Sequence, residues 1–360
     1  MGDQAKPSAL PHQDLVIACV RRHCCLAAAC RRYNPSRFQI VQRRPLAFSK
    51  LPATTIERGA VADLALRFDK DMLTLSTTMD AFFREHDFNP DAERDYAILC
   101  EPELIEEEFR LESVMGTPCF VAPTESITAG RLAKERFDGR ANDVAGAAFA
   151  LAAAFKPQHI IGAVAPSGLP LDPSSAASLK QSRDQYKEAV TALQLHPYEA
   201  VFFCGFQNLT DAQCALMGAR SVFDGPVFLS LQLTEEGLLP HDDARLQKAA
   251  AMLDEYGATV VGMRCGGSPE TLTRAVAEMR QGTDRPLLVE IEVRPASKRL
   301  LNAPVDNPYW HPETLMPAAL ALREAGVQFL RAAGDAMPAC TGVLLSAIEG
   351  TDVVCDKEHA

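Results

Sequence analysis

The strongest constraint on the fold of this 360-residue chain is a series of short apolar runs with few polar interruptions. Most of them are bounded by proline or glycine, and longer stretches with helical patterning separate them. The seven runs are Phe120–Ala122, Ile160–Ala165, Ala200–Cys204, Val227–Leu231, Thr259–Met263, Leu287–Ile291 and Val327–Leu330. Apolar residues that follow one another without alternation indicate strands buried on both faces, as in parallel sheets that are covered by helices.

Segments with the pattern of helices lie between these runs. Pro269–Arg280 follows Ser268, a residue type suited to capping a helix N-terminus. Asp242–Tyr256 and Ser182–Leu195 are amphipathic, and Asn142–Phe155 is so rich in alanine that it predicts a tightly packed helix. This alternation of strand and helix predicts repeated β–α–β units and a parallel sheet.

An eighth strand is expected near Leu46–Ser49. Eight parallel strands close into a barrel, so the sequence predicts an α/β fold, a single (β/α)8 TIM-type barrel, with its functional residues at the carboxyl ends of the strands. An open doubly wound sheet is the alternative, but the glycine-rich phosphate turn that usually follows its first strand is not found. We expect an extension over residues 1–44, the barrel over 45–350 and a tail over 351–360.

Charge separates the front of the chain from the rest. Residues 1–44 hold eight basic and two acidic residues, whereas the whole chain has a formal net charge of −11. Such an acidic chain repels phosphate, which excludes a free nucleic-acid binder. The basic extension contains Cys19, Cys24, Cys25 and Cys30, but no second Cys-x-x-Cys pair supports a metal cluster, and a poorly ordered segment is expected.

The remaining composition indicates a globular protein with no membrane contact. Hydrophobic residues make up 47% of the chain, and no stretch approaches the roughly 20 apolar residues that a bilayer span needs. The eleven cysteines are scattered and no export signal is present, so we expect a cytoplasmic protein with reduced thiols. The loop Lys298–Pro317 could cover a barrel mouth, and Glu106–Glu108 is expected to be a solvated helix face.

Three motifs point to one known family. They are Gly162–Gly168 (Gly-Ala-Val-Ala-Pro-Ser-Gly), Pro226–Ser230 followed by Thr234–Gly237, and Gly262–Glu270 (Gly-Met-Arg-Cys-Gly-Gly-Ser-Pro-Glu). In this order and spacing they resemble the homocysteine S-methyltransferase family, from about Pro45 to Ile348. The resemblance implies a zinc-dependent (β/α)8 barrel that transfers a methyl group to the homocysteine thiol.

The resemblance also implies a zinc site that this sequence does not fully supply. Family members hold zinc with three cysteinates, and the metal lowers the pKa of the homocysteine thiol. Cys265 matches the first of these ligands. Ala333 and Gly334 stand where the other two cysteines are expected, and neither can bind a metal. We therefore expect no cofactor, with zinc present only if other residues have rebuilt the site.

The carboxylates of the family pattern are replaced as well. Ser49 matches the acidic residue of the family's opening turn, and Cys204 matches the glutamate that holds the substrate amino group. With small groups at these positions, we expect a roomier and less charged mouth, and a ligand that is less zwitterionic than homocysteine. The usual methyl transfer is then lost or altered, and the alternative is a non-catalytic barrel that binds a ligand or another subunit.

Other polar residues near strand ends could form a new site. Glu125, Glu292 and Asp335, together with Cys204, could give a metal or acid–base constellation, although separately solvated carboxylates are more common. Arg264, Arg294 and Arg331 also flank strand ends and could capture an anion, although surface ion pairing is the stronger interpretation. The expected partner is a small-molecule ligand, and a methyl donor would be another small molecule or a separate corrinoid protein.

Overall fold

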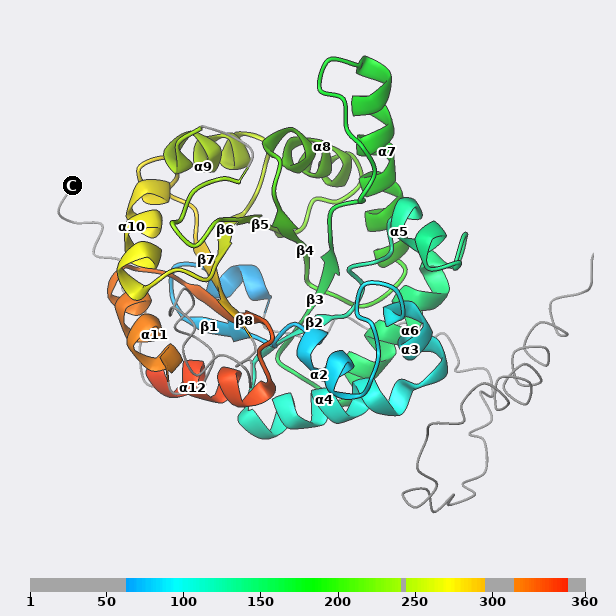
Figure 1. Cartoon of the computed structure of the whole chain (residues 1–360), viewed down its shortest axis with the longest axis horizontal. Coiled ribbons are helices and arrows are strands. Elements are labelled where there is room, and N and C mark those ends of the chain that lie inside the picture. Colours follow the sequence, from blue (N-terminus) through cyan, green and yellow to red (C-terminus); the bar gives the residue numbers. More distant parts are fainter. Residues whose placement is uncertain (1–62, 241–243, 295–313, 349–360) are drawn as a thin grey trace, which may run out of the picture. The chain divides into compact units, whose positions relative to one another are not determined.

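Eight parallel strands close into a barrel in the computed structural model, which describes residues 63–240, 244–294 and 314–348 (Figure 1). The strands are β1 (Leu73–Leu75), β2 (Cys119–Ala122), β3 (His159–Val164), β4 (Ala200–Phe206), β5 (Val227–Gln232), β6 (Val260–Cys265), β7 (Leu287–Val293) and β8 (Phe329–Gly334). Each strand pairs with the next in the chain, and β1 pairs with β8 to close the ring. The predicted (β/α)8 barrel is thereby confirmed.

Helices surround the barrel, as Figure 1 shows in the view along its axis. They are α2 (Asp80–Glu85), α3 (Arg94–Cys100), α4 (Pro102–Met115), α5 (Ala129–Lys134), α6 (Ala141–Ala154), α7 (Ala176–Leu193), α8 (Leu209–Arg220), α9 (Leu246–Glu255), α10 (Pro269–Arg280), α11 (Leu315–Glu324) and α12 (Pro338–Ile348). Ser268 caps α10 as predicted, because its hydroxyl accepts a hydrogen bond from the Thr271 N–H. No helix within the described ranges has the length and apolar character needed to cross a membrane.

An eighth strand exists, but its predicted position at Leu46–Ser49 was wrong. The strand that completes the ring is β1, at Leu73–Leu75. It is hard to detect in the sequence because it is only three residues long, with a threonine between its two leucines and polar residues after them. The segment Leu46–Ser49, the extension 1–44, the tail 351–360 and most of the loop Lys298–Pro317 lie outside the described residues.

Apolar side chains fill the barrel at the amino ends of the strands. Phe202, Phe228 and Phe329 are fully buried inside the ring. A short 3-10 helix, η2 (Leu64–Arg67), packs against this end, and the Phe68 ring that follows it lies 6.2 Å from Phe228 and 5.9 Å from Phe329. Because this end is filled, open space inside the described ring lies toward the carboxyl ends of the strands.

Candidate functional site

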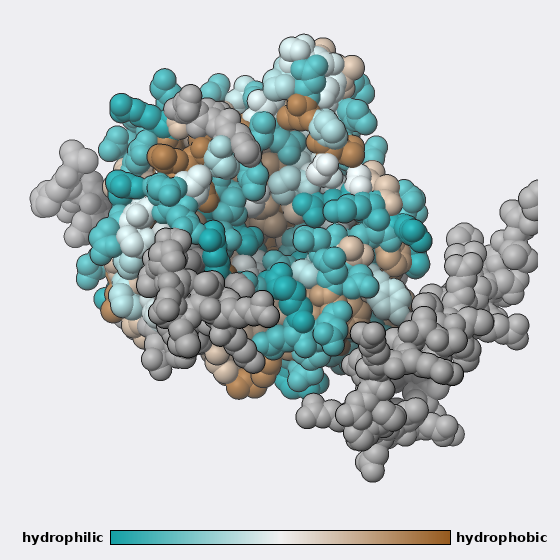
Figure 2. Space-filling view, viewed as in Figure 1, coloured by the Kyte–Doolittle hydropathy of each residue, from teal (hydrophilic) through white to brown (hydrophobic). Residues whose placement is uncertain are grey.

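A cavity of about 360 Å³ lies at the carboxyl ends of the strands, where barrel function is expected. Figure 2 shows mostly hydrophilic residues on this face of the barrel. The described residues that line the cavity are Thr78, Asp80, Pro90, Asp91, Arg94, Glu125, Ser126, Arg131, Glu135, Ala165, Pro166, Cys204, Gly205, Gln207, Gln232, Arg264, Glu290 and Arg331. Five of them are carboxylates and four are arginines, so the mouth is strongly charged, contrary to the expectation of a less charged centre.

A buried ion pair between Glu290 and Arg331, called the floor pair below, lies at the bottom of the cavity. The two residues are register partners on β7 and β8, and Arg331 Nη1 donates to Glu290 Oε2 at 3.2 Å. Arg331 Nε also donates to the Ser76 carbonyl at 2.8 Å, and the guanidinium lies over the Phe202 ring. The Ser230 hydroxyl donates to the other Glu290 oxygen. Because both charges have several partners, the floor pair is largely satisfied by protein groups.

A second ionic cluster forms one wall of the cavity. Arg94 on α3 contacts Asp80 Oδ1 at 2.5 Å and Glu125 Oε2 at 3.4 Å. Burial alone would raise the pKa of Asp80, but the charges of Arg94 and Arg264 hold it below its usual value. Burial alone would lower the pKa of Arg94, but Glu125 and Asp80 raise it. Both groups are therefore ionised at neutral pH.

The opposite wall is formed by residues at the ends of β5, β6 and β7. Gln232 Nε2 donates to Glu292 Oε2 at 2.8 Å. Arg264 Nε lies 3.6 Å from the same oxygen, too far for a hydrogen bond. Burial would lower the pKa of Arg264, but Glu290 and Glu292 raise it, so the guanidinium is charged. Arg264 is thus a cation at the mouth whose nearest carboxylate already accepts a hydrogen bond from another residue.

The two cysteines singled out in the sequence lie on opposite faces of the sheet. Cys204 at the end of β4 lines the cavity, and burial raises the pKa of its thiol to about 12. Cys265 at the end of β6 is fully buried in the apolar layer between strands and helices. Its Sγ lies 3.2 Å from the Thr234 carbonyl and accepts the Gly267 N–H at 3.3 Å, and burial raises its pKa as well. Both thiols are therefore protonated at neutral pH.

The residues at the predicted zinc position do not fit a three-cysteinate site. Ala333 is buried, and Gly334 has a φ of +73°. A Cβ at Gly334 would lie 2.4 Å from the Val293 carbonyl oxygen, so a larger side chain there requires the backbone to move. No group of three or more His, Cys, Asp or Glu side chains in the described part of the chain could hold a metal ion.

The structure places the predicted site residues in three different settings. Glu125 and Cys204 line the cavity, and Glu292 lies next to it through its contacts with Gln232 and Arg264. Asp335 forms an ion pair with Arg84 and is not among the described residues that line the cavity. Ser49 lies outside the described residues.

Two interpretations of charged residues were wrong. Arg331 is 1% exposed and Arg264 lines the cavity, so surface ion pairing holds only for Arg294, which pairs with Glu235 and is about half exposed. Within the predicted solvated face Glu106–Glu108, Glu108 is buried because it points toward the end of β1.

Sequence reasoning missed Asp80, Arg94 and Glu290. Glu290 could have been found from the sequence, because it lies within the apolar run of β7. A glutamate in such a run is buried, and a buried carboxylate needs a partner. The other two lie after β1, the strand that the sequence pattern did not reveal.

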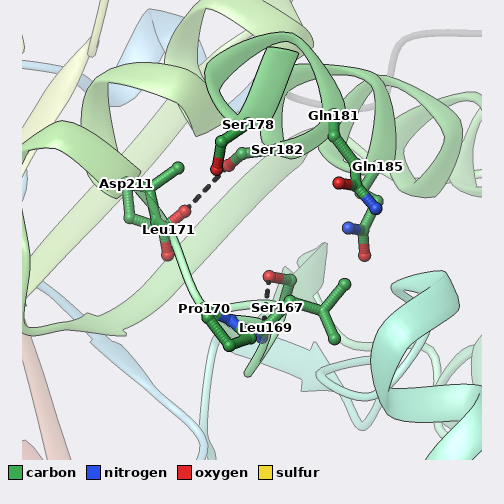
Figure 3. A pocket seen from close by; sticks show the side chains of 9 residues that line it. All are labelled: Ser167, Leu169, Pro170, Leu171, Ser178, Gln181, Ser182, Gln185 and Asp211. Carbon is green, nitrogen blue, oxygen red and sulfur yellow. Dashed lines mark hydrogen bonds between the residues drawn. The ribbon is translucent and has the colours of Figure 1, made fainter. Parts of the chain in front are cut away.

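Another pocket, of only about 10 Å³, lies between the loop after β3 and helices α7 and α8 (Figure 3). Its acidic group, Asp211, accepts hydrogen bonds from Ser182 Oγ at 3.0 Å and from the Tyr186 hydroxyl at 2.8 Å. Tyr186 also accepts the Ser167 N–H, which belongs to the Gly162–Gly168 motif. The pocket has room for about one water molecule, and the hydrogen bonds of Asp211 around it link α7 to α8. Its role is therefore to hold these helices together.

Comparisons with known proteins identify the family of the chain and agree with its fold. A family model described as homocysteine S-methyltransferase matches residues 85–335, more than half of the chain. Among solved structures, the homocysteine methyltransferase MmuM from Escherichia coli in its metallated form matches with a TM-score of 0.63 at 17% identity, covering 80% of this chain and 99% of that chain. Its apo form matches with a TM-score of 0.58 at 18% identity, with the same coverage. No curated protein sequence matches the chain.

Proposed function

We propose a function from one premise: this chain belongs to the homocysteine S-methyltransferase family. Its barrel binds a small molecule at the charged mouth, and it does not transfer a methyl group to a zinc-bound homocysteine thiolate. The protein thus retains ligand binding at the barrel mouth and lacks the zinc chemistry that the family resemblance implies.

The orientation of Cys265 is the observation that carries the proposal. Side chains alternate between the two faces of a strand, and Cys265 packs among apolar residues on the helix side of β6. Its neighbour Arg264 lines the cavity instead. A thiol that faces the helices, contacts a carbonyl and accepts an N–H is held as a neutral buried group.

Loss of the metal removes the reaction's means of activating the substrate sulfur. A free thiol with an ordinary pKa is mostly protonated at neutral pH and is a weak nucleophile. Zinc would supply the Lewis acid that stabilises its thiolate. The arginines that line the described mouth can attract a thiolate by their charge, but they cannot coordinate its sulfur as zinc would.

Metal analysis and calorimetry test the proposal together. Purified full-length protein, after incubation with zinc and gel filtration, should contain far less than one zinc per chain by mass spectrometry. The Cys265→Ala variant should contain the same amount, as should the control Cys214→Ala, which changes a buried cysteine on α8.

The ligand arm uses a matched pair of amino acids. Homocysteine and 2-aminobutyrate differ in their side-chain thiol, so a zinc-dependent site should strongly prefer homocysteine. We expect the two to bind with affinities within about threefold of each other, and no S-methylated product to form with methyl donors. One zinc per chain that is lost in Cys265→Ala, together with a large preference for homocysteine, would show that the proposal is wrong.

A further inference from the structure

We propose that Arg264 binds the carboxylate of the ligand, and that the ligand is a small monocarboxylic acid. This inference deepens the proposed function and rests on it for the existence of a small-molecule ligand. It assigns a chemical class to the ligand and a single anchoring side chain to the mouth.

Arg264 differs from the other three arginines that line the cavity: each of those donates hydrogen bonds to protein groups, whereas Arg264 only approaches Glu292, at 3.6 Å. Arg94 pairs with two carboxylates, and Arg331 is held by Glu290 and by carbonyl oxygens. Arg131 Nε donates to the Pro166 carbonyl at 2.6 Å. These three guanidinium groups serve mainly to hold the walls and floor of the cavity together.

Within the described ranges, the Nε of Arg264 is buried and has no hydrogen-bond partner. The nearest carboxylate oxygen, Glu292 Oε2, is 3.6 Å away and is already 2.8 Å from Gln232 Nε2. A buried donor without a partner is unfavourable, and a guanidinium presents several N–H groups in one plane. Since Nε itself is buried, an incoming carboxylate would meet the two Nη groups at the cavity, and its two oxygens can accept two parallel N–H bonds from them.

The charge around the cavity limits how much negative charge a ligand can carry. The described lining residues include five carboxylates and four arginines, so every added negative charge meets repulsion, and Arg264 can offset one such charge but not the two of a phosphate. Asp80 remains ionised, since Arg94 and Arg264 lower its pKa. A monocarboxylate adds a single charge beside Arg264, and the space of about 360 Å³ is of the size that small-molecule sites have.

Arg294 provides a matched control for a substitution at Arg264. It follows β7, whereas Arg264 lies in β6, but its side chain is about half exposed and pairs with Glu235 outside the cavity. Arg264→Gln removes the charge, and Arg264→Lys keeps the charge but loses the planar pair of donors. Arg294→Gln removes a charge from the same end of the barrel without touching the cavity.

The experiment is calorimetric titration of the full-length protein with butyrate, with butyramide and with inorganic phosphate. We expect butyrate to bind saturably, while the uncharged amide and phosphate bind at least about tenfold more weakly. A charge-assisted bidentate contact predicts that Arg264→Gln weakens butyrate binding roughly 10- to 100-fold. Arg264→Lys should give an intermediate loss, and Arg294→Gln should bind like the wild type.

The comparison of butyrate with butyramide uses the wild-type protein, so it tests the preference for a carboxylate even if one variant fails to fold, and Arg264→Lys then provides a second test of the anchoring residue. Equal binding of acid and amide, tighter binding of phosphate, or unchanged butyrate binding in a folded Arg264→Gln variant would each overturn the inference. If these results occur while the protein remains free of zinc, the proposed function stands and only the role of Arg264 fails. Stoichiometric zinc together with Arg264-dependent butyrate binding would instead support the role of Arg264 and refute the proposed function.

Discussion

Replacing Glu108 by glutamine should make the stability of the barrel less sensitive to alkaline pH. Glu108 and Glu112 lie one turn apart on α4, and both side chains are buried. The Thr77 hydroxyl after β1 lies between them, 2.9 Å from Glu108 Oε1 and 2.8 Å from Glu112 Oε1. Two buried carboxylates this close to one hydroxyl cannot both be ionised without strong repulsion.

Counting donors shows which of the two holds a proton. Burial raises the pKa of Glu112 too, but Glu112 accepts hydrogen bonds from the Thr77 N–H and from the Thr117 and Thr341 hydroxyls, which oppose that rise. Glu108 has a buried Oε2 without a hydrogen-bond partner within the described part of the chain. The single proton of the Thr77 hydroxyl can serve only one neighbour at a time. The Thr77 hydroxyl is satisfied when protonated Glu108 donates to it and it donates to Glu112.

The pH dependence of stability is set by the raised pKa of Glu108 in the folded protein. Burial first, and then the charge of Glu112, raises the pKa of Glu108 to about 8 from an ordinary value of 4.5. The unfolded chain therefore loses this proton first, and the stability linked to it falls as pH rises from about 4.5 to about 8. At about 1.36 kcal/mol for each pH unit, the full loss is roughly 5 kcal/mol as an upper limit.

Urea unfolding followed by circular dichroism, from pH 5 to pH 9, measures this loss. Glutamine cannot ionise, so Glu108→Gln should gain several kcal/mol relative to the wild type between pH 5 and pH 8.5. Glu107→Gln, an exposed neighbour on the same helix, serves as the control and should follow the wild type. The other groups near the pair, Glu85 and Cys340, are unchanged in every variant and cancel in the comparison. A difference between Glu108→Gln and wild type that stays constant within about 1 kcal/mol would refute the reasoning.

Two further predictions concern stability and can be measured by the same unfolding assay at pH 7. Glu290→Ala should lower the free energy of unfolding by about 3–5 kcal/mol, because it leaves Arg331 buried without its counter-ion. Replacing both Glu290 and Arg331 by methionine should lower it less. Equal losses in the two variants would argue against an energetically coupled floor pair. Gly334→Ala should cost at least about 1 kcal/mol more than Gly116→Ala. Both glycines have positive φ, but only at Gly334 does the new Cβ meet a carbonyl oxygen, so similar losses would contradict the close contact.

The fold was predictable where burial left a clear pattern in the sequence. Strands such as β5 and β6 have apolar residues on both faces, and these runs stand out along the chain. The three-residue strand β1 has no such run, so its place could not be found from the residues alone. Helix α2, which follows β1, begins with Asp80, and the error about the strand therefore led to an error about the mouth.

The site was harder to predict because its charges meet only in the closed ring. Glu290 and Arg331 are 41 positions apart in the chain, and their pairing depends on the register of β7 and β8. Sequence patterns can place each residue near a strand end, but they do not give the partner. The positions that match the family's carboxylates hold Ser49 and Cys204, whereas the carboxylates that line the mouth come from other positions, such as Asp80 and Glu290.

The alternation of side chains along β6 connects the metal question with the ligand question. Cys265 faces the helices, and Arg264, one position earlier, must then face the barrel interior. The end of β6 therefore presents a guanidinium to the cavity and keeps its thiol in the apolar layer. A guanidinium attracts the charged group of an acid but cannot form a bond to sulfur, so recognition at this strand can persist after metal-dependent chemistry is lost. The proposed function therefore predicts that the affinity of the mouth depends on the carboxylate of the ligand and hardly at all on a thiol.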